Sequence, residues 1–257
     1  MKLSPLFITA PSRSGSSLLV KMLNCTAQIV VVNEPLNAVN ILDQANIKAI
    51  YNAIEQDLKC GFVKQRVDAM GFEVTDTFPP SKMKWGSINR SSDGVLAVGI
   101  KKSYPAFSNK DFFKPFLNEW PDFVKWFRQE MNGQVIAIIR DPRPTILSWK
   151  TTFDALKEST LNQCIAWNQI SESILKSQNL GVQVIRYEDL ILNPINAVGE
   201  IGKNLAIKLE FNATLPEVER FVLENYLRNK GISLDRAEAV FEIVRDICGE
   251  TAKKFGY

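Results

Sequence analysis

Residues 6–18 have the sequence LFITAPSRSGSSL, and this stretch decides the fold. Leu6 to Ala10 is a short apolar run bounded by a loop, which predicts a buried β-strand. An apolar helical pattern then runs from about Ser16 to Leu23. The Ser/Gly loop between them joins the strand directly to the helix. A strand, a tight loop and a helix in this order are typical of an α/β protein.

The same alternation recurs along the rest of the chain. Four further apolar runs predict strands at residues 29–32, 95–100, 134–139 and 182–186, with helical patterns between them. β-Branched runs that alternate with helices indicate a parallel sheet that is buried on both faces. We therefore predict an α/β fold with a P-loop-type parallel sheet of about four or five strands and helices on both faces. No repeat or linker interrupts residues 1–257, so we expect one domain.

Composition excludes several classes of protein. Lys and Arg number 31 against 28 Asp and Glu, a net charge of only +3, which argues against a nucleic-acid-binding surface or a polybasic membrane tail. No apolar run approaches the ~20 residues that a membrane span needs. The first residues also lack the apolar core of a signal peptide. We expect a cytoplasmic protein with neither a nucleic-acid partner nor a membrane span.

The chain contains no histidine. This absence excludes Ser-His-Asp and Cys-His catalysis, HExxH zinc hydrolysis and an imidazole general base. The four cysteines lie far apart and form no CxxC pair, so we expect no zinc site. Any proton transfer must use a carboxylate, a lysine, a tyrosine, a cysteine or water.

The loop after the first strand has the features of an anion site. Backbone N–H groups and the positive end of a helix dipole meet at such a loop. A glycine would let an anion approach the backbone, serine hydroxyls would add donors, and an arginine would add a fork-shaped charge. The alternative is a Ser-rich turn without a function. The candidate binding residues are Ser12, Arg13, Ser14, Gly15, Ser16 and Ser17.

This loop differs from the Walker A pattern G-x-x-x-x-G-K-S/T. Ser16 stands in place of the lysine, and Ala10 stands in place of the first glycine. The cationic residue, Arg13, precedes Gly15. No Walker B aspartate is evident, because Asp141 follows Arg140 and not an apolar residue. The pattern favours an anion that is bound with little or no metal.

A second candidate site follows the strand at 134–139. Arg140 ends this strand, and Ser148 follows eight residues later on the next predicted helix. Ligands of open α/β sheets bind at the carboxyl ends of the strands. Arg140 could bridge two phosphate oxygens, and Ser148 could add a third contact. The alternative is a surface arginine with an unrelated serine.

Together these motifs resemble the sulfotransferase family, whose donor is 3'-phosphoadenosine 5'-phosphosulfate (PAPS). Residues 11–18 (PSRSGSSL) look like the family's 5'-phosphosulfate loop, and residues 139–143 (IRDPR) with Ser148 look like its 3'-phosphate motif. Residues 185–190 (IRYEDL) are similar to a third segment, which implies that Tyr187 lies near the adenine. The match is nearer to the carbohydrate, tyrosylprotein and bacterial branches than to the cytosolic phenol branch.

The resemblance also implies catalytic roles. Cytosolic members place a histidine base where Ser103 stands here, whereas other branches use a glutamate about twenty residues after the loop cation. Glu34 lies 21 residues after Arg13 and is the expected base. Its alternative role is that of a carboxylate that stabilises a helix N-terminus. Lys101 would lie beside the transferring group, although it could be a plain surface lysine.

The function that we predict is sulfuryl transfer from PAPS to a hydroxyl or amine, which releases adenosine 3',5'-bisphosphate (PAP). The catalytic residues would be Arg13, Glu34 and Lys101, without a metal. The donor would contact residues 12–17, Arg140, Ser148 and Tyr187. Two alternatives are a P-loop kinase-like phosphotransferase and a non-catalytic PAP-binding protein. The acceptor stays open between a small molecule, a glycan, a lipid and a peptide tyrosine.

Two other segments bear on the acceptor. Residues 72–94 are rich in Pro, Ser, Gly, Asp and Asn, which predicts a long excursion from the core. Such a segment often shapes an acceptor site in folds of this kind. Aromatic residues crowd 107–127 at helical spacing, which indicates core packing. Their alternative role is that of a wall or lid for the acceptor.

Overall fold

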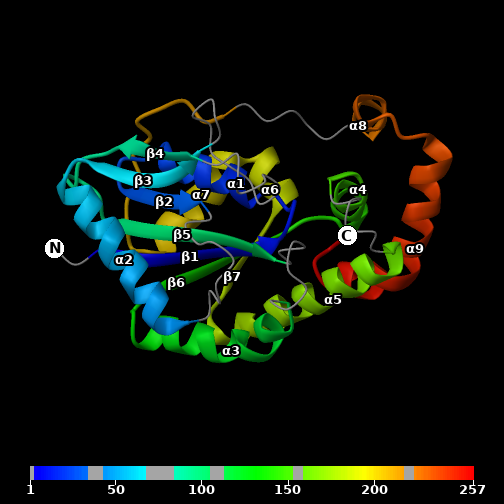
Figure 1. Cartoon of the computed structure of the whole chain (residues 1–257), viewed down its shortest axis with the longest axis horizontal. Helices are drawn as coiled ribbons and strands as arrows, with labels where there is room; N and C mark the ends of the chain where they lie inside the picture. Colours follow the sequence, from blue (N-terminus) through cyan, green and yellow to red (C-terminus); the bar gives the residue numbers. More distant parts are fainter. Residues whose placement is uncertain (1–2, 34–42, 68–83, 105–112, 153–158, 217–222) are drawn as a thin grey trace.

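The computed structural model describes residues 3–33, 43–67, 84–104, 113–152, 159–216 and 223–257. Strands and helices alternate along most of this chain (Figure 1). The elements are β1 (Ser4–Pro11), α1 (Ser16–Asn24), β2 (Ile29–Asn33), α2 (Gln44–Lys59), β3 (Phe62–Val67), β4 (Lys84–Asn89), β5 (Ala97–Tyr104), α3 (Phe113–Gln129), β6 (Gln134–Ile139), α4 (Pro142–Thr152), α5 (Thr160–Ser177), the 3₁₀ turn η4 (Gln178–Leu180), β7 (Gln183–Arg186), α6 (Tyr187–Leu192), α7 (Pro194–Asn204), α8 (Leu223–Lys230) and α9 (Leu234–Lys253).

The main sheet has five strands in the order β2-β5-β1-β6-β7. All neighbouring strands in it are parallel. Each of the five apolar runs identified in the sequence forms one of these strands, so the predicted fold class is confirmed. Because β1 lies in the centre, the loop after β1 emerges between the carboxyl ends of β5 and β6 (Figure 1).

Both faces of the sheet are buried, as the continuous apolar runs indicated. Side chains alternate between the two faces along a strand. Phe7 of β1 packs in a core with α2, α3, α5 and α9, whereas Leu6 and Ile8 pack in a second core with α1, α6 and α7. Helices therefore cover both faces. Within the described ranges, no helix is both long enough and apolar enough to cross a membrane.

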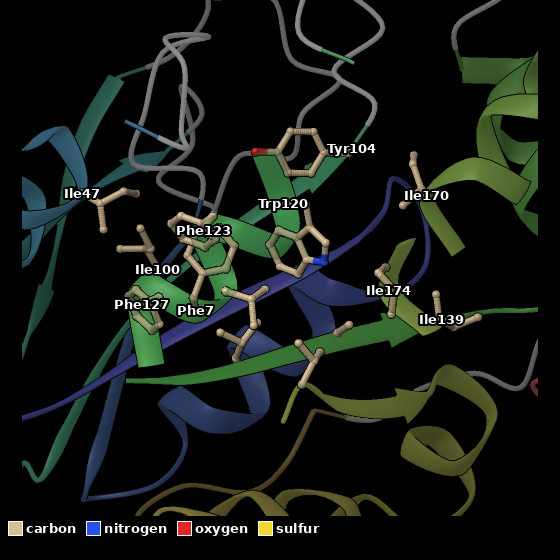
Figure 2. Close-up of a cluster of buried hydrophobic side chains, with 14 of the residues drawn as sticks. Phe7, Ile47, Ile100, Tyr104, Trp120, Phe123, Phe127, Ile139, Ile170 and Ile174 are labelled. Carbon is tan, nitrogen blue, oxygen red and sulfur yellow. The ribbon is translucent and has the colours of Figure 1, made fainter. Parts of the chain in front are cut away.

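The aromatic-rich segment contributes to the first core. Trp120, Phe123 and Phe127 of α3 are buried around Phe7 (Figure 2). The ring centroids of Phe7 and Phe123 are 4.8 Å apart, and those of Phe7 and Phe127 are 5.9 Å apart. Such aromatic pairs stabilise a core beyond their buried area. Core packing is thus confirmed for these three residues, while Phe107 and Phe112 lie outside the described part of the chain.

The structure differs from the sequence expectation at residues 84–89. This part of the predicted excursion is strand β4, which pairs antiparallel with β3 in a separate two-stranded sheet. The segment KWGSIN has neither a β-branched run nor regular alternation, so its strand conformation depends on hydrogen bonds from β3. In the described part of the chain, helix α2 begins at Gln44, where the Asp43 carboxylate accepts the Ala45 N–H at 2.9 Å. Residues 34–42 and 68–83 lie outside the described ranges.

Candidate functional site

The loop between β1 and α1 is held from two sides. The Ser12 N–H donates to the Tyr104 carbonyl of β5 at 2.6 Å, and the Trp149 indole N–H of α4 donates to the Ser12 carbonyl at 2.7 Å. Within the loop, the Ser14 N–H donates to the Pro11 carbonyl at 3.1 Å. These hydrogen bonds fix the loop backbone without a contribution from any ligand.

Two residues of the loop have left-handed backbone conformations. Arg13 has φ +68°, and Gly15, the N-cap residue of α1, has φ +85°. A Cβ atom on residue 15 would lie only 2.2 Å from Cδ2 of Tyr187. Glycine is therefore needed here both for its backbone conformation and for the close approach of the Tyr187 ring.

A cavity of about 210 Å³ opens at the N-terminus of α1. Helix N-termini carry unsatisfied N–H groups and partial positive charge, so this location favours an anion. Most of the predicted site residues meet here. The lining residues are Ser12, Arg13, Gly15, Ser16, Ser17 and Leu18 of the loop and helix, Lys101 and Ser103 of β5, and Arg140 and Tyr187.

Three cationic side chains border this cavity. Lys101 is only 2% exposed, and its Nζ lies 3.5 Å from Ser17 Oγ. Arg140 donates from Nη1 to the Arg13 carbonyl at 3.2 Å and stacks on the Tyr187 ring at 4.4 Å from its centroid. Burial lowers the pKa of Arg140, an effect that the Tyr187 and Glu188 side chains oppose. Arg13, Lys101 and Arg140 together make the cavity strongly favourable for an anion.

Two predicted binding residues do not line the cavity. Ser148 is buried, and its Oγ accepts a hydrogen bond from Arg13 Nε at 3.0 Å, so the two motifs are directly connected. Ser14 is also buried, and its hydroxyl has no partner among the described residues. Ser16 lines the cavity, and its hydroxyl lies 3.0 Å from that of Ser103.

Glu34, the expected general base, lies outside the described residues. It follows Asn33, the last residue of β2, which is in register with Lys101 of β5. The role of Glu34 stays a prediction from the sequence.

A larger hollow of about 600 Å³ adjoins the first. Arg140 and Tyr187 line both, so they stand at the junction. The second hollow has an apolar side, formed by Ile191, Leu192, Leu223 and Phe241, and a polar side, formed by Asp141, Arg143 and Glu188.

Leu223 and Phe241 come from α8 and α9, and no local pattern in the sequence indicated that they line a hollow. Ser103 was named from the sequence only as the residue at the histidine position of cytosolic members, although strand alternation also puts it on the same face as Lys101.

Asp141 acts as a helix cap. Its Oδ1 accepts the Arg143 N–H at 2.8 Å, and both carboxylate oxygens accept from Arg143 Nε at 3.1 and 3.0 Å. The Arg143 guanidinium therefore binds both oxygens of the Asp141 carboxylate at the start of α4. In the part of the chain that the structure describes, no three Asp, Glu or Cys side chains gather closely enough to hold a metal ion.

Three solved structures that resemble this chain are sulfotransferases or sulfotransferase domains. The sulfotransferase domain of the curacin biosynthetic pathway matches 100% of this chain and 98% of its own length, with 16% identity and a TM-score of 0.53. The sulfotransferase domain of the Synechococcus PCC 7002 olefin synthase matches 100% of this chain and 96% of its own length, with 16% identity and a TM-score of 0.49. A sulfotransferase from Alicyclobacillus acidocaldarius matches 94% of this chain and 97% of its own, with 13% identity and a TM-score of 0.47.

No protein-family model and no curated protein matches the sequence. The assignment of the fold rests on the match to the curacin-pathway domain, which spans the whole chain, and on the order of the strands in the sheet. The chain has the fold of a sulfotransferase domain.

Proposed function

We propose that residues 1–257 form one sulfotransferase unit, which transfers a sulfuryl group from PAPS to a hydroxyl or amine and releases PAP. One observation carries this proposal: Arg13, Lys101 and Arg140 converge on a cavity of about 210 Å³ at the N-terminus of α1. Such a cavity is suited to a multiply charged anion. The likeness in fold to sulfotransferase domains supports the same activity.

The two hollows suggest how the donor would lie. The smaller one has room for a phosphosulfate group but not for a whole nucleotide, and its loop would hold that group. The larger hollow, of about 600 Å³, would take the nucleoside against Tyr187. Arg140 stands between the two and would bind the 3'-phosphate, while Ser148, which lines neither hollow, would hold the Arg13 side chain through their hydrogen bond. This arrangement uses both sequence motifs for one nucleotide.

The residues of the small cavity fit in-line transfer of a sulfuryl group. The acceptor oxygen or nitrogen would bond to sulfur while the bond from sulfur to the bridging phosphate oxygen breaks. Negative charge would grow on that bridging oxygen, where Arg13 and Lys101 would stabilise it. The acceptor proton would pass to Glu34, the base expected from the sequence.

A kinase-like activity fits these residues less well. The cation of the loop precedes Gly15, and the carboxylate of Asp141 is bound by Arg143. A loop lysine after the glycine and a free aspartate would be needed to position ATP with magnesium.

The test of this function is an acceptor screen with PAPS that is radiolabelled in the sulfuryl group. The purified chain would be incubated with fractions of metabolites, glycans and lipids from the source cells. We expect label to appear in at least one fraction, with PAP released in equal amount and with no transfer by an Arg13→Ala variant. Binding of PAPS without transfer to any fraction would contradict the proposal and favour a non-catalytic nucleotide-binding protein.

A further inference from the structure

Tyr257, which follows α9, lies at the carboxyl ends of β6 and β7, where it contacts Ile139 and Arg186. Its hydroxyl proton is shared between Glu188 Oε2, at 2.5 Å, and the carbonyl oxygen of Ile139, at 3.2 Å. Burial and the charge of Glu188 raise the pKa of Tyr257 well above its ordinary value, so the phenol stays protonated and acts as a donor.

The carboxylate of Glu188 extends this chain of hydrogen bonds. While Oε2 accepts from Tyr257, Oε1 accepts the backbone N–H of Asp141 at 3.3 Å. Glu188 directly follows Tyr187, and Asp141 directly follows Arg140. The hydrogen bonds that link Tyr257, Glu188 and Asp141 therefore hold the two residues that directly follow the stacked pair, Arg140 and Tyr187, at the junction of the two hollows.

Several contacts hold Tyr257 in this position. The Arg186 guanidinium lies 4.9 Å from the centroid of its ring, and the Tyr257 N–H donates to the Ala252 carbonyl at 3.2 Å. Gly256, at φ +80°, turns the chain after α9. The preceding residue, Phe255, is buried in the first core. Tyr257 itself lines neither the small cavity nor the adjoining hollow.

We infer that Tyr257 is a positioning residue for the donor site: through Glu188 it fixes Asp141, and thereby holds Arg140 against Tyr187. If the hydroxyl is removed, the half-buried Glu188 carboxylate loses its shortest hydrogen bond and turns toward solvent or a nearby arginine. The Asp141 N–H is then released, and the turn that carries Arg140 becomes free to move. The role in nucleotide binding rests on the proposed function, whereas the link between Tyr257 and the Asp141 turn does not.

The first experiment needs no nucleotide. Amide hydrogen exchange, followed by mass spectrometry, would compare wild type, Tyr257→Phe and the matched control Tyr51→Phe. Tyr51 also donates its hydroxyl to a backbone carbonyl, that of Leu6 at 2.6 Å, but it lies on α2 in the first core. We expect exchange in peptides that contain Asp141 to become about 5- to 10-fold faster in Tyr257→Phe, the effect of losing one hydrogen bond. In Tyr51→Phe it should stay at the wild-type rate.

The second experiment measures PAP affinity in a double-mutant cycle. Tyr257→Phe should weaken PAP binding about 10-fold, whereas Tyr51→Phe should not weaken it. Because the effect passes through Glu188, adding Tyr257→Phe to Glu188→Ala should weaken binding no further. Additive losses, or wild-type exchange at Asp141 in Tyr257→Phe, would overturn the inference. If the wild-type chain failed to bind PAP, the proposed function would fall, while the exchange data would still decide the role of Tyr257.

Discussion

The ring of Tyr187 packs directly against the backbone of Gly15, so that a Cβ on residue 15 would lie 2.2 Å from the ring. These two residues are 172 positions apart; Gly15 is the N-cap residue of α1, and Tyr187 is the first residue of α6. Their contact brings the wall of the larger hollow onto the loop after β1. The size of both hollows therefore depends on the absence of a side chain at residue 15.

We predict that Gly15→Ala abolishes anion binding at the small cavity. The methyl group would displace the Tyr187 ring, and the alanine would also be strained at φ +85° by about 1–2 kcal/mol. Gly61→Ala is a matched control, because Gly61 has φ +83° and nothing within 4 Å of a Cβ atom. Denaturant unfolding and PAP titration of both variants make the comparison. A Gly15→Ala variant that bound PAP as well as Gly61→Ala does would show that Tyr187 has no part in the site.

A second prediction concerns the preference for a 3'-phosphate. Arg140→Ala should weaken PAP binding by about 2–4 kcal/mol, because a charged phosphate would lose its partner. Binding of adenosine 5'-phosphosulfate, which lacks the 3'-phosphate, should weaken much less. Arg128→Ala serves as the control, since Arg128 donates to the Gly181 carbonyl before β7 and lines neither hollow. Calorimetry with both nucleotides would decide, and an unchanged preference for PAP would leave Arg140 without this role.

The buried lysine should affect turnover more than binding. Lys101→Met removes a charge that is positioned for the transition state, and loss of one such group lowers turnover about 100- to 1,000-fold. Its neighbour Lys102 points to the opposite face of β5 and does not line the cavity, so Lys102→Met is the control. Initial rates at saturating PAPS would test this expectation. Equal loss in both lysine variants would indicate a general effect on stability.

Glu34 should act on the acceptor and not on the donor. Glu34→Gln keeps the shape of the side chain and removes its basicity, so turnover should fall by about 100- to 10,000-fold. PAP affinity should stay at the wild-type value, as it should in the control Glu119→Gln, at an exposed position of α3. The measurement combines turnover with PAP titration for each variant. Near-normal turnover in Glu34→Gln would reduce the glutamate to a structural carboxylate.

The sequence predicted those parts of the fold that depend on local pattern. Apolar runs of β-branched residues mark β1, β2, β5, β6 and β7, because strands buried on both faces need them. Neither β3 nor β4 was predicted, since the two strands depend on pairing with each other and not on local composition. The Asn-Pro pair at residues 193 and 194 is typical of a helix start, and the Asn193 side chain does cap α7.

The candidate site was predictable to a similar degree. The loop and Arg140 were placed correctly at one edge of the sheet because strand ends meet there. The bond between Arg13 and Ser148 and the contact between Gly15 and Tyr187 join distant segments, so no spacing rule anticipates them. The hydrogen bonds that link Tyr257, Glu188 and Asp141 also join distant segments of the chain, so they too could not be predicted from sequence spacing.

The central claim, that the paired hollows bind a nucleotide with a 3'-phosphate, is tested most directly by calorimetric titration of the purified chain with PAP in the presence of EDTA. The account predicts saturable binding at one site. It also predicts that PAP at 100 times its Kd raises the free energy of unfolding by about 2.7 kcal/mol. It also predicts much weaker binding of ATP with magnesium under otherwise identical conditions. Tight binding of ATP with magnesium and no detectable binding of PAP would contradict the account.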